Sequence, residues 1–318
     1  MAAVGALNSP AGGVATDFRK PSATGRQMQK ERVVLAPWWF LLPALAFYCV
    51  SVIGPSVVGV FSAFTNWDGF SRQSHFVGLK NFFHILSDPS AAAAFRQTLI
   101  LAVAVTVLQN VVGLLLALGV NSGVRSHRPL RVILFAPAVV APVMVAYLWK
   151  YILAPDGALD SILALVAPAS WQLNWLGSTD LALWCVVAVI VWQMSGLSMV
   201  IFLAGLEGIS KEVLEAADLD GAGAFRKFFS VTLPMLRPAV MVTTTLTLIG
   251  GLKQFDTVWA MTSGGPADST QTLSTVIFQN AFSFGYFSYS IAIAVVLTVL
   301  ASPISWLQYR LAHRERDE

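Results

Sequence analysis

Six long apolar segments, separated by polar loops, constrain the fold of this chain more than any other feature. Each has about 20 residues or more, enough for a helix rising about 1.5 Å per residue to cross a hydrocarbon core of about 30 Å. The runs are continuous and do not alternate, so they predict helices and not the strands of a barrel. The predicted spans cover residues 38–64, 96–121, 130–153, 180–206, 236–261 and 288–310.

The overall composition agrees with this interpretation. Of 318 residues, 56% are hydrophobic and only 12% are charged, against about 25% charged residues in soluble domains. We therefore expect an all-α polytopic membrane protein. Cys49 and Cys185 lie inside apolar segments, which favours two buried hydrophobic side chains over a disulfide framework or a metal site.

The distribution of Lys and Arg predicts the orientation. Residues 1–36, 122–131, 207–237 and 310–318 together hold 15 of these 20 residues, and the three other loops hold only Arg72 and Lys80. Positively charged loops stay on the cytoplasmic side. We expect both termini to be cytoplasmic, with 207–237 as the largest cytoplasmic loop.

The chain then divides into four parts. The Ala-, Gly-, Ser- and Pro-rich leader 1–36 is expected to be a disordered cytoplasmic segment. Residues 37–95 hold the first span and an outer loop, in which "FVGLKNFFHIL" favours a short interfacial helix over a plain loop. Residues 96–310 form a core of five spans, and 311–318 are a cytoplasmic tail.

Motifs for bond-breaking chemistry are missing from the sequence. It has no G-x-x-x-x-G-K-[ST] phosphate loop, no H-E-x-x-H pair and no G-x-S-x-G elbow. The spans also hold few carboxylates for a proton relay. We expect no enzyme activity, no catalytic residue, and no cofactor or metal on this chain.

Polar side chains inside the spans are candidates for a solute path. A charge within a span is a functional candidate by default, although Lys253 could also extend to the interface. Amides next to an aromatic ring suit a hydroxyl-rich solute such as a sugar; hydrogen bonds between helices are the alternative. The candidates are Gln109, Asn110, Trp192, Gln193, Lys253 and Gln254.

The largest cytoplasmic loop contains "LEAADLDGAGAFRKFFSVTLPMLRP", residues 214–238. Ser210 can cap a helix over 211–220, and Gly221 is placed to end it in a left-handed conformation. A second helix over 224–232 follows, and Pro234 is expected to break the chain before the next span. This helix–glycine–helix pattern predicts a docking element.

The same stretch resembles the EAA motif, E-A-A-x3-G-x9-I-x-L-P, of permease subunits of binding-protein-dependent ABC importers. Val231 replaces the usual isoleucine. "APVMVAYLWKYILAPDGALD" and "FDTVWAMTSGGPADSTQTLSTVIFQNAF" are similar to segments of the carbohydrate-uptake branch, the maltose-type and glycerol-3-phosphate-type permeases. The residues that match the motif are Glu215, Ala216, Ala217, Gly221, Leu233 and Pro234.

The resemblance implies a type I ABC importer permease fold in a bacterial-type inner membrane. Its implied partners are a second homologous permease, an ATPase dimer that binds ATP and Mg²⁺, an external solute-binding protein and the surrounding lipid, with no nucleic acid. The motif residues would couple the spans to the ATPase; Gly221 would permit the turn, and Glu215 would help to fix the fold of the loop. The alternatives are a secondary transporter driven by an ion gradient and an intramembrane enzyme.

Overall fold

The computed structural model describes residues 38–71, 73–122, 127–165 and 173–314. The chain divides into two units, 1–49 and 50–318. In the first unit the structure describes a 3₁₀ turn, Trp38–Leu41, and helix α1, Leu42–Tyr48. The predicted leader 1–36 and the last residues of the predicted tail lie outside the described residues. The sections below concern the second unit.

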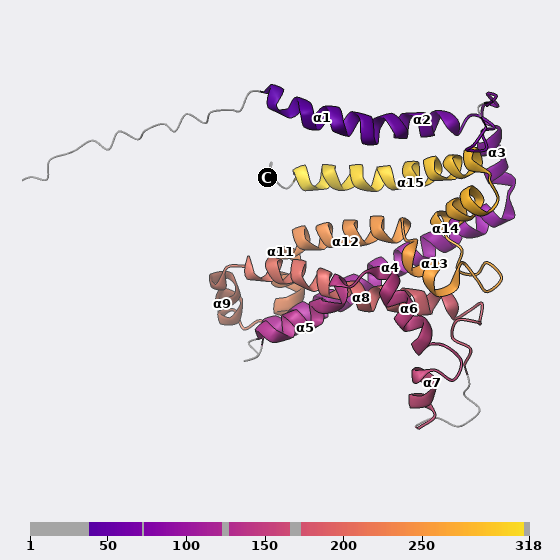
Figure 1. Ribbon diagram of the computed structural model, residues 1–318. Helices are drawn as coiled ribbons and strands as arrows, with labels where there is room; N and C mark the ends of the chain where they lie inside the picture. The colour runs from indigo at the N-terminus through magenta and orange to yellow at the C-terminus, as the bar shows by residue number, and fades with distance from the viewer. Residues whose placement is uncertain (1–37, 72, 123–126, 166–172, 315–318) are drawn as a thin grey trace, which may run out of the picture. The chain divides into compact units, whose positions relative to one another are not determined.

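Helices make up most of the described part of the second unit (Figure 1). Among the described residues, extended pairing is limited to one isolated antiparallel bridge, between Thr65 and Phe76. Three π-helical turns adjoin helices: η2 (Cys49–Ile53), η3 (Phe228–Thr232) and η4 (Gln279–Ser283). The helices are α2 (Gly54–Ser62), α3 (Lys80–Ser87), α4 (Pro89–Asn121), α5 (His127–Val139), α6 (Pro142–Ile152), α7 (Ala158–Leu163), α8 (Ala182–Glu207), α9 (Lys211–Leu219), α10 (Ala224–Lys227), α11 (Leu233–Met235), α12 (Arg237–Leu252), α13 (Asp256–Thr262), α14 (Leu273–Phe278) and α15 (Phe287–Arg314).

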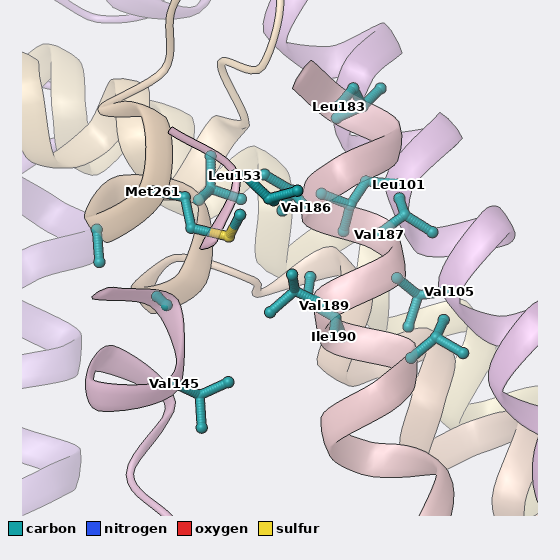
Figure 2. Close-up of a cluster of buried hydrophobic side chains, with 14 residues drawn as sticks. Leu101, Val105, Val145, Leu153, Leu183, Val186, Val187, Val189, Ile190 and Met261 are labelled. Carbon is teal, nitrogen blue, oxygen red and sulfur yellow. The ribbon is translucent and has the colours of Figure 1, made fainter. Parts of the chain in front are cut away.

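Helix α8 forms the centre of the bundle. It packs against α4, α5 and α12, and 67% of its most apolar stretch is buried, against 33% for α4. Figure 2 shows one core cluster, in which Val187 and Ile190 of α8 lie with Val105 of α4. The burial of α8 follows from its composition, because it is apolar on all sides.

Small residues allow the helices to approach closely. Lipid tails are as apolar as leucine, so packing in a membrane depends on close contact more than on exclusion of water. At the contact between α12 and α4, a Cβ placed on Gly251 would lie 2.7 Å from the Cα of Ala102. Position 251 therefore requires glycine for this packing.

The structure bears out only part of the six-span prediction. Within the described residues, three helices are long and apolar enough to cross a membrane: Trp39–Ser62, Pro89–Asn121 and Ala182–Glu207. Their number rises to five if two bent helix pairs each count as one span. The apolar part of α15, Phe287–Pro303, falls short of the required 18 residues. Six spans are therefore not confirmed.

The third predicted span, 130–153, is broken in the middle. Helices α5 and α6 meet at an angle of 94°. Pro142 is the first residue of α6, and Ala141 before it has extended backbone angles (φ −57°, ψ 132°), as expected for a residue that precedes proline. Pro137, by contrast, lies inside α5 without ending it.

The fifth predicted span, 236–261, is wrong as a single helix. Helix α12 ends at Leu252, and α13 begins only at Asp256. Glycine is a poor helix former, and two glycines precede the break. The hydroxyl of Thr272 donates to the freed carbonyl of Gln254 over 3.3 Å, which satisfies part of the interrupted backbone.

The expected short helix in the first outer loop is present as α3. The side-chain amide of Asn81 donates to the carbonyls of Ala63 (2.7 Å) and Thr65 (2.9 Å). These two bonds fix α3 to the end of α2. Helix α4 then starts at once, with Asp88 as its N-cap: the carboxylate accepts from the backbone N–H of Ser90 over 2.9 Å.

Candidate functional site

Helix α9 ends in a complete Schellman turn. The N–H of Ala222 donates to the carbonyl of Ala217 (3.0 Å), and the N–H of Gly221 donates to that of Asp218 (3.1 Å). Gly221 has a φ of +73°, which glycine adopts without the strain caused by a Cβ. The predicted left-handed end at Gly221 is confirmed. Ser210 occupies the N-cap position as predicted, but its side chain makes no capping hydrogen bond.

An ion pair joins the two short helices of the loop. The ammonium of Lys227, the last residue of α10, lies 2.7 and 2.9 Å from the two carboxylate oxygens of Asp218 in α9. Together with the Schellman turn, this pair fixes the angle between the helices. The two helices thus form one preformed unit, which we call the α9–α10 knob (residues 211–227).

The knob is anchored to the bundle by the inner side of α9. Ala217 is buried, and the half-buried Leu214 packs against a core cluster that contains Phe202 and Leu206 of α8. These two α9 positions are three residues apart, so they share one helix face. The N-terminal part of the loop 207–237 therefore rests directly on the end of α8.

The outer side of α9 is exposed. Glu215, Ala216 and Leu219 all face away from the core, and 89% of Leu219 is exposed. The carboxylate of Glu215 makes no hydrogen bond or ion pair with any described residue. The structure therefore gives no support to the expected role of Glu215 in fixing the fold of the loop.

Pro234 does not break the chain, contrary to the prediction. Helical structure continues from α10 through η3 and α11 to Met235, and the bend of 68° comes between this segment and α12. Proline disrupts a helix because its ring collides with the carbonyl one turn earlier. Here the wider π-helical turn η3 precedes Pro234 and accommodates that ring.

The last two residues of the motif differ in burial: Leu233 is half-buried and Pro234 is exposed.

Two exposed aromatic residues were missed by the sequence analysis. Phe225 is 78% exposed and Phe229 is 49% exposed. Their rings lie 4.7 Å apart and form an aromatic ledge that runs from α10 of the knob into η3. The spacing of four residues in "AFRKFF" is the signal that could have found them, since such residues are neighbours on a helix. Exposed aromatic rings of this kind are typical of interaction sites.

The same end of the bundle carries one further link. Arg131 at the start of α5 lies 2.7 Å from Glu207 at the end of α8. Leu236, at the bend between α11 and α12, is fully buried in the cluster beneath the knob. The ends of α5, α8 and α12 thus meet at the base of the knob.

A small cavity lies inside the bundle between α4, α8 and α12. Its volume is about 180 Å³, and Gln109, Gln254, Ser198, Thr243 and Thr247 supply its polar groups. We call it the bundle cavity. Two of the six predicted path residues, Gln109 and Gln254, line it; the other four do not.

The amides of these path candidates are partly occupied by the fold. Gln109 donates to the carbonyl of Met194 (3.2 Å) and the hydroxyl of Ser198 (3.0 Å). Gln254 donates to the hydroxyl of Thr257 over 3.0 Å. Each side-chain oxygen accepts no hydrogen bond from the described residues, so it can accept one from a solute.

Gln193 has a structural partner at the break of the third predicted span. Its amide is buried and donates over 2.9 Å to the carbonyl of Val140, which the break between α5 and α6 leaves without a helical partner. Trp192 is 44% exposed, and its ring packs edge-on against that of Trp149. Neither residue reaches the bundle cavity.

The last two candidates, Asn110 and Lys253, differ in exposure. Asn110 donates to the hydroxyl of Thr247 over 3.0 Å, and its own oxygen is buried without a partner in the described part of the chain. Lys253 is exposed and stands just past the end of α12. The predicted position of Lys253 within a continuous helix is therefore wrong.

Comparison with known proteins identifies the family to which the chain is similar. Residues 109–317 match the family described as "Binding-protein-dependent transport system inner membrane component". The chain is 31% identical over 281 residues to the probable starch degradation products transport system permease protein AmyD of Thermoanaerobacterium thermosulfurigenes, covering 88% of this chain and 95% of the relative. It is also 31% identical to the multiple sugar-binding transport system permease protein MsmF of Streptococcus mutans, covering 87% and 95%.

A solved structure shares the fold. The match is to a chain in the crystal structure of a bacterial alginate ABC transporter in complex with an alginate pentasaccharide-bound periplasmic protein, with a TM-score of 0.75, 20% identity, and coverage of 86% of this chain and 93% of that chain. The type I importer permease fold expected from the motif is thereby shown. This chain belongs to the family of binding-protein-dependent transport system inner membrane components.

Proposed function

We propose that this chain is the permease subunit of an ATP-driven importer for a sugar or sugar-like solute. The proposal rests above all on the α9–α10 knob, which carries the EAA residues from Glu215 to Gly221 and joins the ends of α5, α8 and α12. The printed functions of the sugar-permease relatives support the class of solute. A second homologous permease would complete the path, and an external binding protein would deliver the solute.

The knob and the aromatic ledge would form the contact with the nucleotide-binding subunit. Gly221 shapes the turn, Ala216 leaves room for a close approach, and the exposed Leu219 and Phe225 offer apolar surface. Ala217, Leu233 and Pro234 would transmit the motion to the bundle. Glu215 would act on the exposed side, toward the partner. ATP and Mg²⁺ would bind to the ATPase dimer and not to this chain.

Orientation follows from the knob. An ATPase that consumes cellular ATP meets the knob from the cytoplasm, so the knob end of the bundle would face the cytoplasm of a bacterial-type cell. The excess of Lys and Arg in 122–131 and 207–237 supports the same side. Both termini would then be cytoplasmic, in the inner membrane.

The bundle cavity would form part of the path. Gln109 and Gln254 line it with acceptor oxygens that have no partner in the described part of the chain, and the hydroxyls around them suit a solute rich in O–H groups. The volume of about 180 Å³ is smaller than typical ligand pockets of about 300–1,000 Å³, so the path would widen when a second permease is in place. The other four path candidates do not line this cavity and would contact the solute elsewhere along the path: Trp192, Gln193, Asn110 and Lys253.

Copurification from the native membrane in mild detergent tests the assembly. We expect an ATP-binding subunit and a second permease to accompany the wild-type chain. Substituting both Leu219→Asp and Phe225→Asp should remove the ATPase and retain the second permease. The matched control is Leu165→Asp, because Leu165 is 84% exposed but lies far from the knob in sequence, after α7.

Uptake into reconstituted vesicles distinguishes an importer driven by ATP from a transporter driven by an ion gradient. The purified assembly, with its binding protein outside and ATP inside, should accumulate a sugar from a panel of mono- and disaccharides. Uptake by this chain alone, driven by an ion gradient without ATP, would instead establish a secondary transporter and reject the importer.

A further inference from the structure

A second and larger cavity lies at the end of the bundle opposite the knob. Its volume is about 650 Å³. Its walls come from the loop after α2, from α3, from the first turn of α4, from η4 and from the start of α15. In Figure 1 these elements lie at the far end of α4 from α9. We call it the α3–α15 cavity, and it shares no lining residue with the bundle cavity.

Hydrogen bonds between distant segments hold the walls in place. The hydroxyl of Tyr289 donates to the carboxylate of Asp88 over 2.6 Å. The hydroxyls of Thr65 and Ser288 lie 3.2 Å apart, and the N–H of Ser288 donates to the carbonyl of Trp67 over 3.2 Å. These contacts join the loop after α2 and the start of α4 to α15. The cavity is therefore preformed, which reduces the entropy lost when a ligand binds.

The lining offers both donors and acceptors that the fold leaves unused. Asn66 and Gln279 each use the side-chain oxygen within the fold, which leaves their NH₂ groups without a partner among the described residues. Asn81 and Asn280 use only their NH₂ groups, which leaves both oxygens available. Such a mixture of donors and acceptors matches sugar hydroxyls, because each hydroxyl donates one hydrogen bond and accepts others.

Aromatic rings and charge narrow the class of ligand. Trp67 and the exposed Tyr286 line the cavity and can cover the C–H faces of a pyranose ring. Two carboxylates, Asp68 and Asp88, also line it, while none of the described lining residues is a lysine or arginine. An anionic saccharide would meet repulsion there, and a neutral one would not.

Both carboxylates are held in the charged form. Hydrogen bonds from the backbone N–H groups of Ser71 and Phe70 lower the pKa of Asp68. Burial alone would raise the pKa of Asp88, but the Tyr289 hydroxyl, the N–H of Ser90 and nearby His84 outweigh it, so that this pKa lies below its ordinary value. The cavity therefore carries two negative charges at neutral pH.

We propose that the α3–α15 cavity is a binding site for a neutral, hydroxyl-rich saccharide, separate from the bundle cavity. The site needs only this chain. It therefore stands or falls independently of the importer proposal, which needs an ATPase and a second permease. If the knob end faces the cytoplasm, the site opens on the outer side, where it would raise the local concentration of solute beside the path.

Saturation-transfer NMR on the full chain in phosphatidylcholine nanodiscs tests the site, with maltose as the neutral probe and digalacturonate as the anionic one. Detergents with sugar head groups are avoided because they would compete. We expect a signal from maltose and a much weaker signal from digalacturonate. The double variant Asn280→Ala, Tyr286→Ala should weaken maltose binding about tenfold, as expected for the loss of one hydrogen bond and one ring contact.

Two further variants complete the test. Asp68→Asn keeps the oxygen that accepts from the N–H groups of Ser71 and Phe70 but removes the negative charge. The signal from digalacturonate should therefore rise toward that from maltose. Tyr151→Ala is the matched control, because Tyr151 is 76% exposed and lines neither cavity, and it should leave the maltose signal unchanged. The proposal is overturned by equal signals from the two probes, by no maltose signal, by a signal that survives the double variant, or by one that Tyr151→Ala abolishes.

Discussion

Lys227 and Asp218 are nine residues apart in sequence and form a two-pronged ion pair across the turn at Gly221, with distances of 2.7 and 2.9 Å. The pair is partly exposed, so its contribution to the free energy of unfolding is about 0.2–1 kcal/mol. Its larger effect is geometric, since it sets the angle at which α10 leaves α9.

The first prediction concerns this ion pair. Lys227→Met should leave the melting temperature nearly unchanged but lower solute-stimulated ATPase activity of the reconstituted assembly several-fold, because the knob loses its fixed angle. Asp218→Asn should have the same effect. The charge-exchanged double variant Lys227→Asp, Asp218→Lys should recover part of the activity. Equal loss in the exchanged double variant and in the single variants would show that the pair itself has no such role.

The second prediction concerns the Schellman turn. A Cβ at Gly221 meets no atom within 4 Å, so the cost of Gly221→Ala is purely conformational. That cost is about 1–2 kcal/mol for a side chain in the left-handed region. Gly221→Ala should weaken coupling of ATP hydrolysis to uptake while membrane insertion stays intact. Gly221→Asn is the matched control, because asparagine tolerates this conformation.

The third prediction concerns the contact between α12 and α4. Gly251→Ala places a methyl group against Ala102 and should lower the melting temperature of the purified chain, with a loss of about 1–3 kcal/mol from overpacking. Gly250→Ala is the control, because a Cβ at Gly250 meets nothing within 4 Å. That variant should be neutral or slightly stabilising, since alanine favours helix. Similar losses for both variants would contradict the close approach.

The fourth prediction concerns Asp88 and its partner Tyr289. The pKa of Asp88 is lowered in the folded protein, so its contribution to stability is present above the unfolded pKa and is lost as the pH falls through the folded one. Tyr289→Phe should lower the melting temperature at neutral pH. The difference from wild type should shrink below the ordinary pKa of 3.8. A difference that stays constant from neutral to acidic pH would rule out the ionised Asp88 as its source.

Local rules predicted those features that depend on neighbouring residues alone. The left-handed turn at Gly221 follows from the backbone preference of a single residue. The charge of each loop and the length of each apolar run can likewise be read from the residues of that segment alone. The EAA motif was recognised because its residues are contiguous in the sequence.

Features that depend on distant contacts could not be predicted in this way. Pro234 was expected to break the chain, but the π-helical turn before it changes the outcome. Gln193 was a candidate for the path, and only the folded chain shows that its amide meets the carbonyl of Val140. The α3–α15 cavity joins segments about 200 residues apart, such as Asp88 and Tyr289, and no local pattern announces it.

The hydrogen bond from Gln193 to Val140 has a consequence for how the bundle moves. Separating α8 from the break between α5 and α6 would leave a bare carbonyl and a bare amide in surroundings without water, at a cost of several kcal/mol. The two elements are therefore expected to travel as one rigid body during the transport cycle. The hinge that opens the path must therefore lie elsewhere, at contacts made only by apolar and small side chains. Such contacts can slide without leaving a buried polar group that lacks a hydrogen bond.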